Sequence, residues 1–138
     1  LVLLKNQLEA HHADPRLLAV GEIGLDLFEQ GLRQDRMNHF FIEQLRLARH
    51  YELPVVLHVR KAQDQVVAGL RRFGIRQGIA HAFNGSEKQA QAYVAQGMVL
   101  GFGGAITYTR AQRIRHLASW LSEDDWVLET DSPDIRPE

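Results

Sequence analysis

The side chains of this sequence best suited to bind a divalent cation are Glu22, His58, His81 and Asp131, each near the end of a short apolar stretch. Taken singly, each has a structural interpretation: a hydrogen-bonded histidine, an aspartate that shapes a turn, or a glutamate paired with an arginine such as Arg60. Taken together, they favour a metal site, because apolar strands should not bury ionisable groups repeatedly at one rim. Two imidazoles and two carboxylates give a nitrogen and oxygen ligand set for a divalent metal.

The other histidines are weaker candidates. Predicted helices contain His39, His50 and His116, while His11 and His12 are adjacent near a helix end. Adjacent helical residues point in different directions, so His11 and His12 make a poor chelating pair. We interpret all of these histidines as surface or helix-packing residues.

The elements that must position the candidate ligands are short apolar strands. The predicted strands span residues 18–26, 54–59, 78–83, 98–103 and 126–131. They are rich in Val, Ile and Leu with little alternation, as expected for strands buried on both faces. The fourth strand contributes no ligand. It ends in glycines, which let the backbone or a ligand approach closely.

Amphipathic helices are predicted between these strands. The chain begins inside a helix, and residues 33–52 repeat apolar side chains at three- and four-residue steps. Asp64 is expected to cap a helix that runs through Leu70, with Gly74 beyond its end.

Two further helices carry the pattern of a capping box. Ser86 with Gln89 forms one box, and Gly97 is expected to close the helix that follows. Thr109 with Gln112 forms the other. Strand, helix and strand at this short spacing predict right-handed crossovers and a parallel sheet.

Two α/β architectures fit this order of elements. One is an open, doubly wound sheet, and the other is part of a (β/α)₈ barrel, which typically takes roughly 250 residues. In both, function lies at the carboxyl ends of the strands. The pattern alone leaves both open.

Composition sets broad limits on the partners. The 138 residues, 45% hydrophobic and 24% charged, are typical of a single globular domain, which we assign to residues 1–138. No apolar run approaches the length of a membrane span, and the absence of cysteine fits a cytoplasmic protein. A net charge of -1 argues against broad electrostatic capture of nucleic acid, but permits a local phosphate-binding cleft.

Several segments resemble the TatD family of metal-dependent hydrolases. They are GEIGLD at residues 21–26, LPVVLHVR at 53–60, HAFNG at 81–85, the glycine-rich strand at 100–107 and LETDSP at 128–133. Gln34, Phe41 and Gln44 are similar to the family's helix before the second of these motifs. The matches follow the family's order over most of the chain, so the set is far more specific than any one motif.

This resemblance implies a TIM barrel of the metal-dependent hydrolase type and a phosphodiesterase, usually a deoxyribonuclease. It implies two divalent metal ions, whether zinc, magnesium or manganese, and DNA or another phosphodiester as substrate. By the resemblance, Glu22 bridges both ions, His58 and His81 hold one, and Asp131 holds the other and orients or deprotonates the attacking water. Arg60 is expected to contact a phosphate, with a structural salt bridge as the alternative.

The chain departs from the family in one respect. The family carries a His-x-His pair on its first strand, and this sequence contains no such pair. The strands that the resemblance implies after Asp131 are missing too. We therefore interpret the chain as a portion of a longer protein with about five βα units of an incomplete barrel. If it is the whole polypeptide, we expect self-association through its sheet edges and weak or absent catalysis.

Two alternatives to a phosphodiesterase remain at this point. One is a related barrel hydrolase that cleaves amide or ester bonds, since substrate choice resides in loops. The other is a catalytically incomplete α/β fragment that associates through exposed strands.

Overall fold

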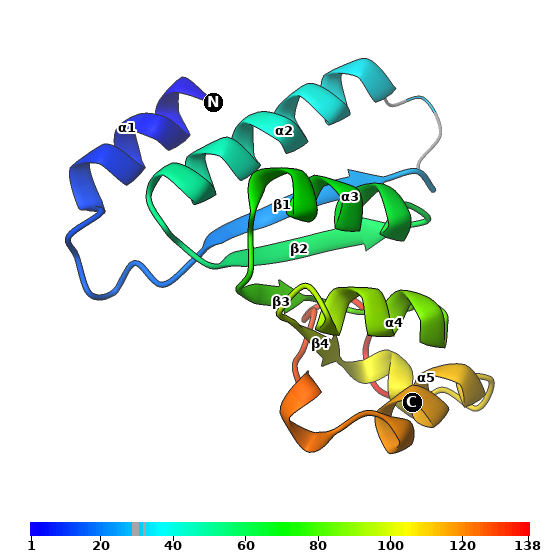
Figure 1. Ribbon diagram of the computed structural model, residues 1–138. Helices are drawn as coiled ribbons and strands as arrows, with labels where there is room; N and C mark the ends of the chain where they lie inside the picture. The colour runs from blue at the N-terminus through cyan, green and yellow to red at the C-terminus, as the bar shows by residue number, and fades with distance from the viewer. Residues whose placement is uncertain (29–30, 32) are drawn as a thin grey trace.

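The computed structural model describes residues 1–28, 31 and 33–138. Its centre is a five-stranded parallel sheet in the order β1-β2-β3-β4-β5 (Figure 1). The strands are β1 Val20–Asp26, β2 Val55–Arg60, β3 Gly78–Ala80, β4 Met98–Phe102 and β5 Trp126–Leu128. Strand order in the sheet thus follows the chain without the reversal that defines a doubly wound fold. The structure confirms the barrel-type α/β architecture as a partial barrel.

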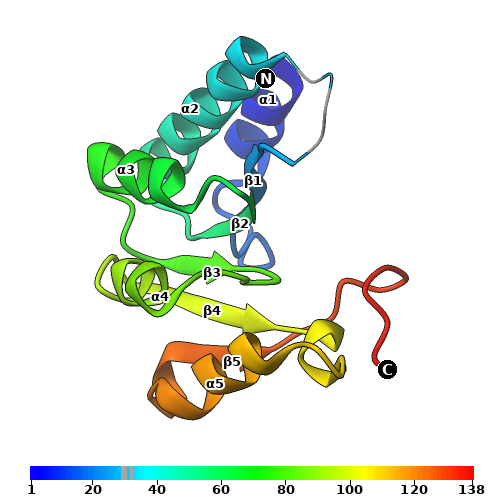
Figure 2. The same cartoon turned by 90° about the vertical axis from the view of Figure 1, so that its right-hand side faces the viewer.

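Helices cover one side of this sheet. They are α1 Val2–His11, α2 Gln34–His50, α3 Gln63–Phe73, α4 Glu87–Val94 and α5 Gln112–Trp120, with short 3₁₀ turns η1 Gly104–Thr107 and η2 Glu123–Asp125. Helix α2 packs on β1, α3 on β2 and α4 on β4, and α3 contacts both α2 and α4. Figure 2 shows the helices following one another in an arc around the sheet. The candidate ligands lie on the opposite side of the sheet, toward the carboxyl ends of the strands.

The apolar periodicity of the helices explains how they dock. Helix α2 buries Phe41, Leu45 and Ala48, the face that the three- and four-residue spacing predicts. Gly69 of α3 lets this face approach, because a Cβ there would lie 2.7 Å from the Phe41 ring. Gly74 ends α3 in the left-handed conformation, with φ 65°, as predicted.

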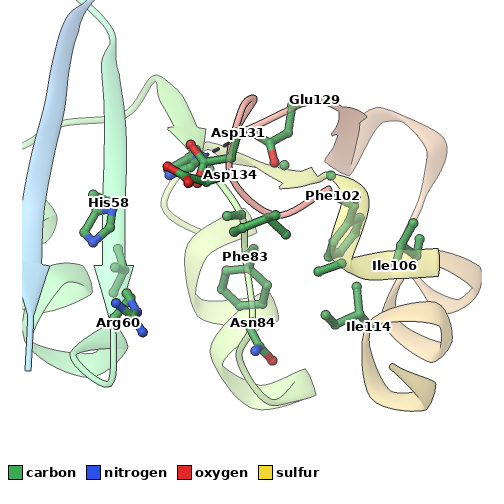
Figure 3. A pocket seen from close by; sticks show the side chains of 18 of the residues that line it. His58, Arg60, Phe83, Asn84, Phe102, Ile106, Ile114, Glu129, Asp131 and Asp134 are labelled. Carbon is green, nitrogen blue, oxygen red and sulfur yellow. Dashed lines mark hydrogen bonds and ion pairs between the residues drawn. The ribbon is translucent and has the colours of Figure 1, made fainter. Parts of the chain in front are cut away.

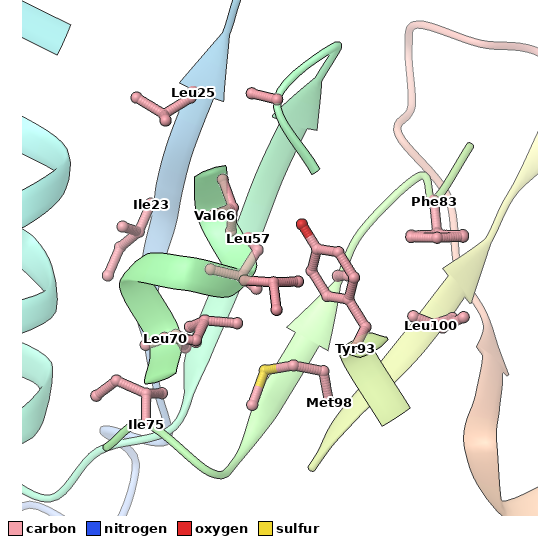
Figure 4. Packing of buried hydrophobic residues seen from close by; sticks show 14 of the residues in the cluster. Ile23, Leu25, Leu57, Val66, Leu70, Ile75, Phe83, Tyr93, Met98 and Leu100 are labelled. Atoms are coloured by element: carbon pink, nitrogen blue, oxygen red, sulfur yellow. The ribbon is translucent and has the colours of Figure 1, made fainter. Parts of the chain in front are cut away.

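The core lies between the sheet and these helices (Figure 4). Ile23, Leu57 and Leu70 are fully buried there, and so is Tyr93. The Tyr93 hydroxyl donates a hydrogen bond of 3.3 Å to the carbonyl of Gln63, which satisfies the phenol inside the core. Burial raises the pKa of this phenol, so the group stays neutral.

Two of the predicted caps are wrong. Ala62 is the N-cap of α3, and Asp64 lies in the first turn, where its Oδ1 accepts a hydrogen bond of 3.3 Å from Gln89. Helix α5 begins at Gln112 without a side-chain cap. The backbone and hydroxyl of Thr109 instead donate to the carboxylate of Glu138. In both cases the side chain that was expected to cap the helix instead forms a hydrogen bond with a residue distant in sequence.

The Ser86 box is confirmed. Ser86 accepts from the backbone of Gln89, and the Gln89 side chain accepts from the backbone of Ser86. Helix α4 ends at Val94, before Gly97, which has φ 85°.

Three strands end earlier than predicted, β4 by one residue and β3 and β5 by three. Strand β3 stops at Ala80, because Ala82 adopts a left-handed conformation with φ 45°. Strand β5 stops at Leu128, although Glu129 still donates a backbone hydrogen bond of 3.2 Å to Phe102. His81 and Asp131 therefore lie in loops just beyond the strands.

No helix in the described part of the chain is both long and apolar enough to cross a membrane.

Candidate metal centre

Glu22 and His58 each lie next to a residue that enters the core. Ile23 follows Glu22 in β1 and Leu57 precedes His58 in β2, and both are buried, so Glu22 and His58 lie on the other side of the sheet. Gly24 pairs with His58 across the two strands, and a Cβ at Gly24 would lie 1.6 Å from the His58 carbonyl oxygen. Glycine is therefore required for the close approach of β1 to β2 at the site.

Glu22 lies between two histidines. Its Oε2 is 3.5 Å from Nδ1 of His58, and its Oε1 is 3.7 Å from Nε2 of His81. One ligand atom from each of the three residues lies within 4.8 Å of the others. The imidazole rings are 5.9 Å apart between centroids. This is a cluster of the size that surrounds a single cation.

The far nitrogen of His81 contacts a second carboxylate. Nδ1 of His81 lies 3.1 Å from Oε2 of Glu129. Because an ionised carboxylate can only accept, Nδ1 is the donor in this contact, and in the neutral ring Nε2 is then the nitrogen available to bind a metal ion. Glu129 was not among the residues predicted for the site. The signal for it was a second carboxylate at the end of the fifth strand.

His58 is held in the same way. Its Nε2 lies 3.3 Å from Oδ2 of Asp26, so its Nδ1 faces Glu22. Each imidazole is thus held between Glu22 and a further carboxylate. Asp26 was not predicted for this position, because the contact depends on the register of β1 and β2.

Glycines in and after β4 make room for Glu129. A Cβ at Gly101 would lie 2.9 Å from Cγ of Glu129, and a Cβ at Gly103 would lie 2.7 Å from its Oε1. This oxygen is buried and has no hydrogen-bond partner among the described residues. The glycine-rich strand supplies space for a carboxylate.

Asp131 lies in the loop after β5, apart from the three-residue cluster. It lines the same pocket as His58, His81 and Glu129, and so does Asp134 (Figure 3). Within the described ranges, the group with ligand atoms in close reach contains Glu22, His58 and His81. The structure therefore brings together three of the four predicted ligands and places the fourth on the wall of their pocket.

Arg60 forms a salt bridge to Asp26. Its Nη1 is 3.3 Å from Oδ2 of that residue, and its side chain also lines the pocket. Of the two expectations for Arg60, the salt bridge is present, and its place in the pocket also suits contact with a phosphate.

The residues present fit a divalent cation. With Asp26 or Glu129 at its outer nitrogen, each neutral imidazole presents its other nitrogen toward Glu22 as a ligand atom, and the Glu22 carboxylate lies 3.5 and 3.7 Å from these two nitrogens. A divalent cation between the three residues would be bound by all of them. Imidazole and carboxylate suit zinc, and other divalent metals bind similar sets.

Parallel βα units in consecutive order, with imidazole and carboxylate side chains gathered from β1, β2 and the loop after β3, define a class: barrel-type hydrolases with a candidate metal centre toward the carboxyl ends of the strands. Comparison with known proteins assigns the chain within this class. Residues 3–138 match the family model described as TatD related DNase. The chain belongs to the TatD family of metal-dependent hydrolases, as the sequence motifs indicated.

Individual relatives agree with this assignment. The chain is 43% identical to the uncharacterized metal-dependent hydrolase YjjV of Escherichia coli K12 over 87% of its own length and 47% of the relative's. The crystal structure of YjjV superposes with a TM-score of 0.91, over 98% of this chain and 52% of that one. The 3'-5' ssDNA/RNA exonuclease TatD of Cronobacter turicensis is 35% identical over 95% of this chain and 51% of that protein. The chain thus spans about half the length of the relatives it matches.

Proposed function

We propose that this chain supplies the metal-binding and water-activating residues of a phosphodiesterase that cleaves DNA or another nucleic acid strand. The observation that carries the proposal is the pair of imidazoles, each turned toward Glu22 by a second carboxylate. The relative from Cronobacter turicensis, a 3'-5' ssDNA/RNA exonuclease by name, supports nucleic acid as the substrate. Because the chain spans about half of such relatives, the activity is proposed for the complete catalytic unit.

In this proposal Glu22, His58 and His81 would hold a divalent cation, and Glu22 and Asp131 would hold a second one. Bound zinc, magnesium or manganese would lower the pKa of water and offset the charge on the phosphoryl oxygens. Asp131 orients the attacking water and accepts its proton at the carboxylate. Its place on the pocket wall, outside the three-residue cluster, suits a group that works on the water.

The second carboxylates act through the histidines. Glu129 fixes the ring of His81, and Asp26 fixes the ring of His58, so that the nitrogen facing Glu22 is the one with a lone pair. Without their partners, the imidazoles would lose rotational freedom on binding the ion and would bind it less tightly.

The test is metal binding and hydrolysis measured on the same preparations. Isothermal titration with Mn²⁺ or Zn²⁺ should give binding to the wild type that H58A removes and H116A retains. His116 is the matched control, because it is an exposed histidine paired with Glu87 at 2.9 Å outside the site. Metal-stimulated cleavage of a phosphodiester reporter, with no cleavage of amide or carboxylic ester reporters, would support the proposal.

Three results would contradict it. Cleavage that persists in EDTA would exclude the metal role. Preferential cleavage of an amide or carboxylic ester would move the protein to another type of hydrolase. Tight metal binding without hydrolysis by the complete catalytic unit would show that these residues hold the ion without catalysing the reaction.

A further inference from the structure

We propose that Phe28, Arg60 and Lys61 form a phosphate-binding subsite for a single strand of nucleic acid, at the side of the metal pocket. The subsite would receive an internucleotide phosphate next to the one that is cleaved. The ligand class rests on the proposed function, while the subsite itself rests on the contacts among these three residues.

Two cationic side chains contact the ring of Phe28. The Arg60 guanidinium carbon lies 4.3 Å from the centroid of the Phe28 ring, and the Lys61 ammonium nitrogen lies 4.6 Å from it. Both distances are within the range of cation–π attraction. The Phe28 side chain is 51% exposed, and all three residues line the same pocket as His58. The two positive charges are therefore held at the place where a substrate strand would enter.

The backbone at Lys61 is bent to make this possible. Consecutive residues of a strand point to opposite faces, so Arg60 and Lys61 would diverge in an extended chain. Lys61 instead has φ 55°, in the left-handed region that non-glycine residues rarely adopt. The turn brings both side chains to one ring. Strained backbone of this kind is concentrated at functional sites.

Asp26 anchors the subsite. Its Oδ1 accepts a hydrogen bond of 2.9 Å from the backbone of Phe28, and its Oδ2 lies 3.3 Å from Arg60. The same carboxylate holds His58, so the subsite and the metal cluster share one fixed residue. A phosphate at the subsite would thus be positioned relative to the metal ligands by a short chain of contacts.

The charge pattern of the pocket points to a phosphate as the ligand. Arg60 and Lys61 place two cations against one ring, and a phosphate beside them would be attracted by both, in addition to the contact that Arg60 makes with Asp26. A guanidinium has several donors, so a contact with Asp26 is compatible with a second acceptor. Proteins that hold single strands without sequence preference combine backbone-tracking cations with aromatic side chains. The chain has a net charge of -1, so it has no general excess of positive charge to attract a strand. Attraction of a phosphate would therefore depend on local cations such as these.

The experiment is fluorescence anisotropy of a labelled single-stranded oligonucleotide with the whole chain, in EDTA to prevent cleavage, over a range of salt. The variants are K61A, F28L and F28Y, with K5A as the control. Lys5 is exposed on α1 and lies outside the residues that line the pocket. K5A removes the same charge at another place, and F28Y keeps an aromatic ring.

For K61A, we expect the slope of log K against log salt to fall by about 0.7, the value for one lost contact with a single-strand phosphate. For F28L, we expect affinity to fall about two- to fivefold, as cation–π pairs at exposed sites predict. F28Y should bind as the wild type does, and so should K5A. Thermal unfolding by circular dichroism establishes that each variant is folded.

The outcomes separate the subsite from the proposed function. If K61A and F28L bind like K5A while metal-dependent cleavage is intact, the subsite is overturned and the phosphodiesterase stands. If both weaken binding but the complete catalytic unit cleaves nothing with Mn²⁺, the subsite stands and the proposed function fails. Complete displacement of the oligonucleotide by millimolar inorganic phosphate would identify a site for free phosphate and overturn the assignment to a strand.

Discussion

At the scale of single residues, the candidate centre is organised by carboxylates that do not face the ion. Glu129 and Asp26 each contact the outer nitrogen of a histidine, at 3.1 and 3.3 Å. A carboxylate in that position fixes the tautomer and the orientation of the ring, and raises its basicity as a ligand. The affinity for metal should therefore depend on residues that never touch it.

We expect E129Q to bind Mn²⁺ or Zn²⁺ about 10- to 100-fold more weakly, as loss of such outer partners typically causes. E87Q is the matched control, because Glu87 also pairs with a histidine, His116, but on the exposed surface. Calorimetric titration of both variants provides the measurement. Equal affinities for E129Q and E87Q would assign Glu129 no influence on the ion.

At the scale of elements, glycines determine how closely the strands and their loops approach the site. Gly24 lies against the backbone of His58, and Gly101 and Gly103 lie against Glu129. At the first of these positions the obstacle is backbone, which cannot turn aside. At the other two it is a side chain with some freedom to move.

We expect G24A to destabilise the protein by about 3 kcal/mol or more, since overpacking against fixed atoms commonly reaches that size. G74A is the control: its φ of 65° costs about 1–2 kcal/mol, but no atom lies within 4 Å of the added Cβ. Chemical denaturation of both variants measures the difference. A G24A variant as stable as G74A would show that β1 can move away from β2 without cost.

The sequence predicted structural features correctly where they depend on residues that are close together in the chain. The apolar face of α2 and the capping box at Ser86 follow from neighbours in the chain, and both are present. The box expected at Thr109 is absent, because Glu138, distant in sequence, takes its donors. The spacing of neighbouring residues cannot reveal that a distant residue will accept the hydrogen bonds of Thr109.

The same distinction applies to the candidate site. Residue type and position at strand ends predicted Glu22, His58 and His81, which the structure brings together. The partners Asp26 and Glu129 could not be assigned, since their contacts span 32 and 48 residues and depend on strand register. Which nitrogen of each histidine faces Glu22 is likewise decided by those distant partners.

At the scale of the whole molecule, the sheet has two outer strands. In the described part of the chain, β1 and β5 each pair with one neighbour only. Leu128, the last residue of β5, is 74% exposed, and Val127 beside it is also exposed. An outer strand with apolar side chains is a template for pairing with another chain.

We therefore expect the isolated chain to self-associate as its concentration rises, and L128K to reduce this association. Charged residues, lysine in particular, oppose pairing at strand edges. L3K is the control, because Leu3 on α1 is 79% exposed but lies on a helix. Sedimentation velocity of the wild type, L128K and L3K measures the extent of association. A monomeric wild type, or equal effects of the two substitutions, would contradict the role of β5.

Consecutive strand order also has a consequence for how the centre forms during synthesis. Each strand pairs with the one made just before it, so the sheet can grow as the chain emerges from the ribosome. The contacts that orient the metal ligands would form in the same order. His58 meets Asp26 once the second strand has docked, whereas His81 waits for Glu129, 48 residues later. Tight binding of an ion would then come only once the fifth strand has paired with the fourth.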